Sequence, residues 1–288
     1  MRTLIVGCGY VGKALGEELA RRGHEVFGLT RTVEAQKEFK RIGIVPFEAD
    51  ITKPVDLAKL PVDFDWVVNC VSSSRGGAQD YRSVYLGGMR NLIQWLSIRP
   101  PKKFVYTSST SVYGQTDGSL VTEVSPTEPA TETARILLEA EKVLLQAAAP
   151  SFPALLLRVA GIYGPGRGYW LKQFLTGEAS IEGKGDRYLN MVHRDDVVGA
   201  IIAALEKGSV REIYNVADDE PVRQIDFFQW LSKQLNKPMP PSLEPQERAE
   251  RKRASTNKKI SNARLKSLLR YEFKYPTFRD GFRSLLIP

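Results

Sequence analysis

The chain begins with a pattern that sets its architecture: Thr3-Leu4-Ile5-Val6-Gly7-Cys8-Gly9-Tyr10-Val11-Gly12. A short apolar run, which predicts a strand, leads into a G-x-G-x-x-G turn and then into an amphipathic pattern that predicts a helix over Val11–Arg22. Gly7 would allow a tight turn, Gly9 would let the backbone approach a pyrophosphate, and Gly12 would let the helix pack on the strand. The N–H groups at the start of the helix, from Tyr10 onward, would bind those phosphates. The pattern therefore predicts a dinucleotide site.

The chain beyond this pattern alternates short β-branched runs with amphipathic stretches. The strand-like runs are Glu25–Leu29, Ile44–Phe47, Trp66–Asn69, Phe104–Thr107, Ala154–Val159 and Glu212–Val216. The helical patterns are Val33–Arg41, Tyr81–Ile98, Thr133–Ala149 and Asp195–Glu206. Strands that alternate with helices form parallel sheets through crossover connections. We therefore predict an α/β protein with a doubly wound parallel Rossmann sheet and a small C-terminal substrate lobe.

In the later part of the chain a proline-rich stretch and a basic run follow the regular alternation of strand and helix patterns, and this change suggests the domain boundaries. We expect residues 1–165 to form the dinucleotide-binding domain, with its sheet completed by residues 190–217. Residues 166–189 and 218–288 would form the C-terminal lobe. Four prolines lie between Lys237 and Pro245, as expected of a connection inside that lobe.

The overall composition is that of a soluble globular protein, with 42% hydrophobic and 26% charged residues. No apolar run approaches the roughly 18 residues of a membrane span, and no signal peptide is evident. Two cysteines, Cys8 and Cys70, form neither a disulfide framework nor a metal cluster. We expect a cytoplasmic monomer or homodimer that binds neither membranes nor metal ions.

The net charge of +8 comes from 41 lysines and arginines against 33 acidic residues. Half of it lies in one run between Gln246 and Lys259, where two acidic residues accompany Arg248, Arg251, Lys252, Arg253, Lys258 and Lys259. This run is either a solvated charged segment or an attractor for a phosphate-bearing ligand. Nucleic acid is the weakest alternative, because no aromatic interleaving or recognition motif accompanies the charge.

The end of the second predicted strand, Gly28-Leu29-Thr30-Arg31, bears on the choice of cofactor. An enzyme that uses NAD usually places a carboxylate here for the ribose 2′-hydroxyl. This chain places Thr30 and Arg31 there, and a guanidinium can hold a 2′-phosphate through two parallel hydrogen bonds. The alternative is a surface arginine that happens to follow a strand. The sequence favours NADP over NAD.

Five further segments occur in a family's order and at its approximate spacings. They are Glu48–Ile51, Phe104–Gly114, Leu157–Gly166, Met191–Val197 and Ile213–Val216. Together with the glycine loop, they make the chain resemble the extended short-chain dehydrogenase/reductase family, and in particular its NAD-dependent epimerase/dehydratase branch. The resemblance implies a doubly wound Rossmann domain and a small C-terminal lobe that closes over the nicotinamide.

The resemblance also assigns roles by position. Asp50 and Ile51 would contact the adenine, and Cys70 with Val71 would line the cofactor at the end of the fourth strand. Ser109 matches the serine that hydrogen-bonds the substrate oxygen.

Family members carry a Y-x-x-x-K motif on the following helix, and this chain lacks it. Aligning Glu139-Ala140-Glu141 with the end of the family's helix pattern puts Thr133 at the tyrosine and Leu137 at the lysine. No tyrosine in the chain has a lysine four residues later. A threonine hydroxyl has too high a pKa to act as a tuned acid, and leucine supplies no cation.

Two other positions depart from the family. Tyr85 replaces the supporting asparagine of the preceding helix and faces the vacant lysine position, so it is a candidate substitute phenol. Gly161 stands where nucleotide-sugar enzymes place an asparagine, which weakens the case for a sugar-nucleotide substrate. With Ser109 as the one usual catalytic residue, the chain resembles the atypical subgroup of the family.

Three more residues are candidates for substrate contact. The resemblance places Tyr113 and Tyr163 on loops at the cleft, where they would act as substitute phenols, in packing or in positioning the substrate. His193 either orders the loop before a helix that Asp196 caps, or serves as a base, since its ordinary pKa would suit that role.

Three functions follow from these observations. The chain is an NADP-dependent oxidoreductase or epimerase with non-standard acid–base residues, acting on a small carbonyl or sugar-like substrate. Alternatively, it is a catalytically weakened NADP-binding sensor or scaffold, or a module that binds phosphate ligands through the basic run. Ser109 and the intact glycine loop favour the first two functions over the third.

Overall fold

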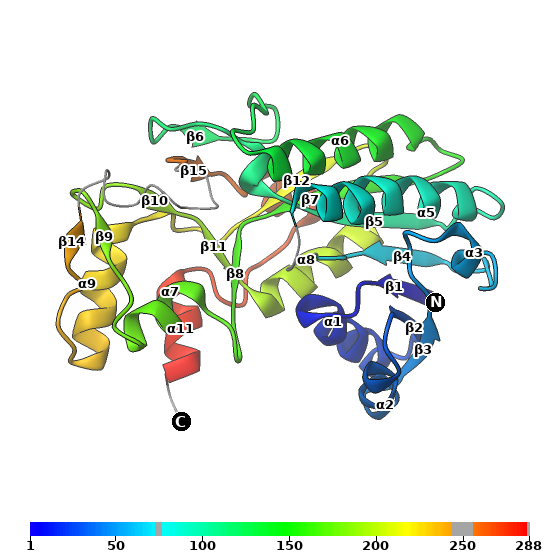
Figure 1. Cartoon of the computed structure of the whole chain (residues 1–288), viewed down its shortest axis with the longest axis horizontal. Coiled ribbons are helices and arrows are strands. Elements are labelled where there is room, and N and C mark those ends of the chain that lie inside the picture. The colour runs from blue at the N-terminus through cyan, green and yellow to red at the C-terminus, as the bar shows by residue number, and fades with distance from the viewer. Residues whose placement is uncertain (73–76, 244–255, 287–288) are drawn as a thin grey trace.

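A parallel sheet of seven strands forms the centre of the computed structural model, which describes residues 1–72, 77–243 and 256–286 (Figure 1). The strand order is β12-β7-β5-β4-β1-β2-β3. The strands are β1 (Arg2–Val6), β2 (Glu25–Thr30), β3 (Ile44–Glu48), β4 (Trp66–Asn69), β5 (Lys103–Ser109), β7 (Ala154–Val159) and β12 (Ile213–Val216). The direction of winding reverses between β1 and β4, where doubly wound sheets bind their ligands. The predicted fold class is confirmed.

Helices cover both faces of the sheet, as Figure 1 shows. One face carries α1 (Tyr10–Arg21), α2 (Val33–Arg41) and α8 (Arg194–Lys207), and the other carries α3 (Pro54–Leu57), α5 (Gly88–Leu96) and α6 (Glu132–Ala147). Alternate residues of β1 belong to opposite cores: Ile5 packs with the first group, and Leu4 and Val6 pack with the second. Burial on both faces explains why these strands are almost continuously apolar.

The helix predicted over Tyr81–Ile98 is divided into three pieces. They are α4 (Ala78–Tyr81), the π-helix η1 (Arg82–Gly87) and α5. At the junction a Cβ on Gly88 would lie 2.5 Å from the Ile51 side chain, so the helix approaches the preceding loop closely. The apolar period gives no sign of the wider π turn, which occurs frequently at functional sites.

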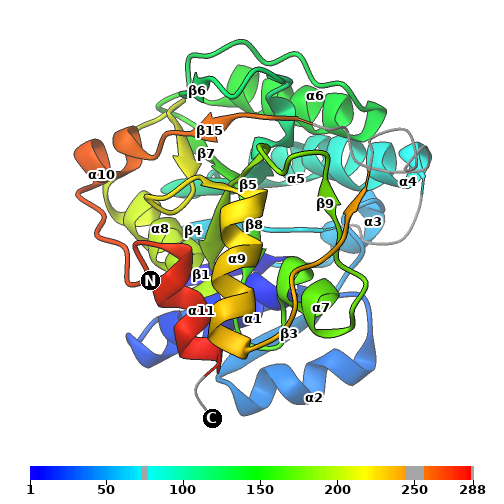
Figure 2. The ribbon, with the colours of Figure 1, turned by 90° about the vertical axis from the view of Figure 1, so that its left-hand side faces the viewer.

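Several of the elements after β7 pack around an apolar cluster separate from the two cores that cover the sheet. The elements are β8 (Gly161–Tyr163), α7 (Tyr169–Leu175), β9 (Ile181–Glu182), β10 (Tyr188–Leu189), β11 (Met191–His193), β13 (Val222–Arg223), α9 (Gln224–Leu235), β14 (Ser242–Leu243) and α11 (Phe278–Leu286). Figure 2 shows α9 beside α11, and Phe227, Phe228, Phe278 and Phe282 fill the space around them. The exact domain boundaries stay a prediction.

The last part of the chain returns to the sheet-bearing half. After the 3-10 turn η2 (Thr110–Val112) comes β6 (Leu120–Val121), and β15 (Lys259–Ile260) pairs with β6 in parallel. The helix α10 (Ala263–Leu269) follows. The buried carboxylate of Asp196 accepts hydrogen bonds from the Tyr271 hydroxyl (2.9 Å) and the Tyr275 N–H (3.0 Å), which ties this segment to α8.

Of the basic run, Lys258 and Lys259 are described, and Arg248, Arg251, Lys252 and Arg253 lie outside the described residues. Within the described ranges, no helix combines the length and apolar character that crossing a membrane requires.

Candidate functional site

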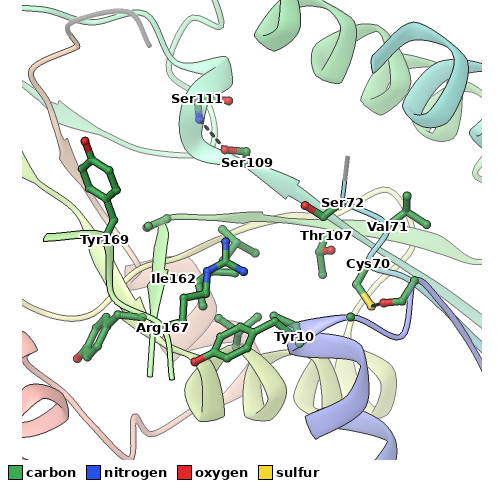
Figure 3. A pocket seen from close by; sticks show the side chains of 18 of the residues that line it. Tyr10, Cys70, Val71, Ser72, Thr107, Ser109, Ser111, Ile162, Arg167 and Tyr169 are labelled. Atoms are coloured by element: carbon green, nitrogen blue, oxygen red, sulfur yellow. Dashed lines mark hydrogen bonds between the residues drawn. The ribbon is translucent and has the colours of Figure 1, made fainter. Parts of the chain in front are cut away.

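A cavity of about 2650 Å³ runs along the carboxyl ends of the central strands (Figure 3). It begins at the glycine loop after β1, passes the ends of β2, β4 and β5, and continues to the start of α6 and to α7. Nearly all of the residues predicted to bind the cofactor lie along it. They are Gly7, Gly9, Tyr10, Val11, Thr30, Arg31, Asp50, Ile51 and Cys70.

The three glycines of the loop are required for different physical reasons. Gly7 has a φ of +90°, and a Cβ there would lie 2.6 Å from the Val71 backbone. A Cβ on Gly12 would lie 2.4 Å from the Gly7 carbonyl oxygen, so this glycine allows the helix to pack against the loop. A Cβ on Gly9 would meet no protein atom within 4 Å. The chain itself therefore leaves the space beside Gly9 open, as a dinucleotide pyrophosphate requires.

The first turn of α1 suits an anion. Its N-cap, Gly9, makes no side-chain cap, and the turn contains no acidic residue, so the helix dipole and its N–H groups face the cavity. Tyr10 donates a hydrogen bond to the Pro165 carbonyl (3.1 Å), while the guanidinium groups of Arg167 and Arg194 lie 5.1 and 5.3 Å from its ring centre. In Figure 3 the Arg167 side chain extends into the cavity above Tyr10. Arg167 therefore adds a cation to the cavity beside the helix start, whereas Arg194 is paired with Asp195 (2.9 Å).

The opposite end of the dinucleotide region contains Arg31 and Asp50. Arg31 is exposed, and it forms no ion pair within the described ranges. Asp50 accepts hydrogen bonds from the Thr52 N–H (2.9 Å) and hydroxyl (2.8 Å). Burial alone would raise the pKa of Asp50, but these bonds and the nearby Arg31 charge lower it. Asp50 is therefore a fixed anion that holds its own loop.

The two cysteines are poor nucleophiles. Cys70 donates to the Gly7 carbonyl oxygen (3.3 Å), and burial raises its pKa to about 12. Burial also raises the pKa of Cys8 well above its ordinary value. Since the thiolate is the reactive form, both residues act as packing groups around the glycine loop.

Ser109, Tyr85, Thr133 and Leu137 also line the cavity. We call the part that they line the reacting end, because the resemblance aligns these positions with the catalytic positions of the family. Ser109 ends β5, and its Oγ accepts a hydrogen bond from the Ser111 N–H (3.2 Å), drawn in Figure 3. This bond leaves the Ser109 hydroxyl proton available to another acceptor. Tyr85 comes from the π-helix, with its ring centre 4.9 Å from that of Tyr81.

Thr133 and Leu137 lie one turn apart on α6, and both line the cavity. The Thr133 hydroxyl lies 3.3 Å from that of Thr131, which caps the helix by accepting the Ala134 N–H. Leu137 is 7% exposed and packs in the core. Neither side chain carries a charge or a titratable proton near neutral pH.

Tyr113 does not line the cavity. It is fully buried, donates to the Asn215 side-chain oxygen (2.9 Å) and accepts from Arg158 (2.8 Å). Arg158 in turn pairs with Glu141 (2.8 Å) on α6. This buried network joins α6 to β7 and β12, so the Tyr113 side chain has a structural role.

Tyr163 and His193 lie side by side near α11, but only Tyr163 lines the cavity. The Tyr163 ring stacks on Phe282 with centroids 4.3 Å apart. His193 is buried, its Nδ1 accepts the Asp195 N–H (3.2 Å), and burial lowers its pKa to about 4. His193 is thus a neutral cap for α8, a role that the sequence suggested for Asp196. Nowhere in the described ranges do three His, Cys, Asp or Glu side chains gather as metal ligands.

Two cations, Arg167 and Lys258, are among the cavity residues that were missed at the level of sequence. Arg167 belongs to the Gly-Pro-Gly-Arg segment, and its position beside Tyr10 could have been suspected from the resemblance alone. Lys258 was one cation within the basic run, and nothing in the sequence distinguishes it from its neighbours. It is buried and lines the cavity.

Comparisons with known proteins identify the family and agree with the fold. The model of the NAD dependent epimerase/dehydratase family matches residues 3–217. The chain is 30% identical to Protein YeeZ of Escherichia coli K12 over 280 residues, which is 96% of each protein. A structure of a conserved protein of unknown function from Silicibacter pomeroyi has a TM-score of 0.83 at 26% identity, covering 99% of this chain and 97% of that one. The UDP-glucuronic acid 4-epimerase of Bacillus cereus, solved with NAD, shares the fold with a TM-score of 0.81 at 22% identity, covering 98% and 96%.

Proposed function

Because this chain belongs to the NAD-dependent epimerase/dehydratase family, we propose that it binds NADP in preference to NAD and uses it on a small carbonyl or sugar-like substrate. The reaction would be an oxidoreduction or an epimerisation. One observation carries the proposal: a single cavity joins the open space beside Gly9 to the Ser109 hydroxyl. A dinucleotide bound in the first part would reach the second.

The preference for NADP rests on Arg31. Its guanidinium lines the cavity without an ion-pair partner among the described residues, so it is available to a 2′-phosphate. A 2′-hydroxyl has no charge to offer this group in return. Asp50, the nearby carboxylate, accepts both hydrogen bonds from Thr52 on its Oδ1.

NADP, when bound, supplies a hydride acceptor or donor. The residues of this chain would then orient the substrate. Ser109 can donate its hydroxyl proton to a substrate carbonyl oxygen, because the Ser111 N–H binds a lone pair of the Ser109 oxygen and leaves the proton free. Hydrogen bonds aimed at an oxygen that gains charge stabilise the transition state. Tyr85 is the cavity-lining phenol best placed by sequence to replace the family's tyrosine.

The second candidate function is a cofactor-binding sensor or scaffold. The observation in its favour is the pair Thr133 and Leu137, which offers the reaction neither an acid nor a cation. The dinucleotide part of the cavity does not depend on these two residues.

One experiment separates the two functions. The purified protein would be examined for bound nucleotide by absorbance and mass, and NADPH oxidation would be followed against aldehydes, ketones and nucleotide sugars. Turnover with any of them supports the enzyme. NADPH binding without oxidation across the panel supports the sensor, and failure to bind either NADPH or NADH would refute both.

A further inference from the structure

Lys258 is a buried cation in the wall of the cavity. It is 5% exposed, and its Nζ donates to the Tyr113 carbonyl oxygen (2.5 Å) and the Thr256 hydroxyl (3.2 Å). Both acceptors are neutral. A protonated lysine has three donors, so one N–H remains for a ligand.

Among the described residues no carboxylate forms an ion pair with Lys258, which is physically unusual for a buried ammonium group. Removing an ammonium group from water costs several kcal/mol unless a counter-charge is supplied. The chain supplies one for another deeply buried cation, since Arg158 lies 2.8 Å from Glu141. For Lys258 no described carboxylate forms an ion pair, and burial lowers its pKa to about 8.

Hydrogen bonds hold the backbone around Lys258 and thereby fix the point from which its side chain enters the cavity wall. The Asn190 side chain donates to the Lys258 carbonyl oxygen (2.8 Å) and accepts from the Ile260 N–H (2.7 Å). On the other side, the Lys259 N–H donates to the Ser119 carbonyl oxygen (2.9 Å). These bonds extend the β15–β6 pairing and preorganise the ammonium group.

The same cavity contains Ser109. The Tyr113 carbonyl that anchors Lys258 directly follows η2, the 3-10 turn that begins after Ser109. The cavity is therefore lined both by Ser109, which can donate a hydrogen bond to a carbonyl oxygen, and by Lys258, a cation with one N–H left for a ligand.

We propose that Lys258 binds a carboxylate of the substrate, so that the substrate class is a carbonyl compound or sugar acid that carries one carboxylate. This inference rests on the proposed function. A carboxylate fits the single N–H that Lys258 has left, and inorganic phosphate is included in the test because Arg167, Lys172 and Arg187 also line the cavity. Lys258 is a specificity-determining residue in this assignment, and Ser109 contacts the reacting oxygen.

The test uses benzoate and its uncharged analogue benzamide as probes, with binding measured by ligand-observed NMR. The wild-type protein should bind benzoate at least about tenfold more tightly than benzamide, as expected of a charge-assisted hydrogen bond. Lys258→Met should remove this preference. The matched control is Lys259→Met, whose Nζ lies over the Tyr188 ring, and it should retain the preference.

A second measurement needs no variant and guards against misfolding of Lys258→Met. Reductive methylation of the wild-type protein, followed by peptide mass analysis, should show that benzoate slows modification of Lys258 relative to Lys259. Benzamide should have no effect. Equal binding of both probes by the wild type, or an intact preference in Lys258→Met, would overturn the assignment, as would protection by inorganic phosphate but not by benzoate.

The outcome is separable from that of the proposed function, because NADPH titration is measured independently. A protein that prefers benzoate but binds no dinucleotide would refute only the proposed function. A protein that binds NADPH and shows no preference for benzoate would refute only the role of Lys258.

Discussion

The two ends of the cavity differ in which part of the chain forms them: the backbone at one end, and side chains at the other. At the dinucleotide end the backbone makes the site: Gly7 turns the chain, Gly12 admits the helix, and Gly9 leaves space. At the reacting end, side chains on α6 would have to supply the chemistry, and Thr133 and Leu137 do not. A binding site formed by the backbone loses its function only when the shape of the cavity changes, for example when a side chain fills the space beside Gly9. A site formed by side chains can lose its chemistry while the cavity and the helix stay the same, because threonine and leucine fit α6 as well as tyrosine and lysine would.

The helix α6 illustrates this difference within one element. Its first cavity-facing residues have no acid–base chemistry, whereas Glu141, one turn beyond Leu137, keeps a buried pair with Arg158 at 2.8 Å and accepts from Ser108 at 2.5 Å. Breaking a buried pair costs roughly 3–5 kcal/mol, because it leaves a charge without a partner. The packing of α6 is thus strongly constrained, and its chemistry is not.

The largest effect should come from filling the space beside Gly9. Gly9→Val should weaken NADPH binding by about 1,000-fold or more, equivalent to about 4 kcal/mol, because its side chain would occupy the volume that the pyrophosphate needs. The fold should survive, since Gly9 has a φ of −85° and a Cβ there meets no protein atom within 4 Å. Calorimetric titration with NADPH checks this.

The matched control for that variant is Gly77→Val. A Cβ on Gly77 would likewise meet no protein atom within 4 Å, and Gly77 also precedes a helix, but it does not line the cavity. This variant should bind NADPH like the wild type. Tight binding by a folded Gly9→Val protein would mean that the dinucleotide lies elsewhere.

The next effect concerns Ser109, the one residue that matches a usual catalytic position of the family. Under the proposed function, Ser109→Ala should lower kcat by about 100-fold, the usual cost of removing one hydrogen-bond donor to a developing oxyanion. Ser111→Ala is its control, because Ser111 lines the same cavity and binds Ser109 through its backbone N–H, which the substitution keeps. Steady-state kinetics on any substrate found in the carbonyl panel would compare the two. Equal rates would remove Ser109 from the reaction.

A smaller effect distinguishes NADP from NAD. Arg31→Asp should reverse the preference between NADPH and NADH by more than about tenfold, because hydrogen bonds to charged groups contribute about 1.5–3 kcal/mol. The substitution replaces a guanidinium, which binds a 2′-phosphate, with a carboxylate, which accepts a hydrogen bond from a 2′-hydroxyl. Arg41→Asp, at the exposed end of α2 and away from the cavity, controls for the change in net charge. Equal calorimetric affinities of the wild type for both cofactors would contradict the prediction.

The features that could be predicted from the sequence are those that depend on local residues, and the features that could not depend on distant contacts. Strands β4 and β7 and helix α2 have the bounds that the apolar patterns indicated, because burial on both faces of the sheet leaves a strong local signal. The glycine loop was predicted for the same reason, since its backbone requirements are local.

Features that depend on distant contacts were not predicted. The π turn at Arg82–Gly87 leaves no mark in the apolar period. The burial of Lys258 depends on a contact with Tyr113, 145 residues away in the sequence. Tyr113 itself was expected at the cleft, but Arg158 and Asn215 hold it in the interior. Each of these outcomes was decided by tertiary packing.

The smallest effect should come from Thr133, and its smallness is informative. Thr133→Val should leave turnover within a few-fold of the wild type, because the one hydrogen-bond partner of the Thr133 hydroxyl among the described residues is the neutral Thr131 hydroxyl, and Leu137 lies one turn away. General acid–base catalysis usually contributes about 10²–10⁴-fold, so a true acid at this position would be evident in kcat.

Tyr85→Phe, measured beside Thr133→Val, removes only a phenolic hydroxyl from the facing helix. A loss of about 100-fold in Tyr85→Phe alone would show that the phenol has moved from α6 to η1. The opposite result, a large loss in Thr133→Val with Tyr85→Phe and Ser109→Ala near the wild type, would mean that the reacting end is intact in a form that the alignment of α6 missed. The contrast between the two ends of the cavity would then fail.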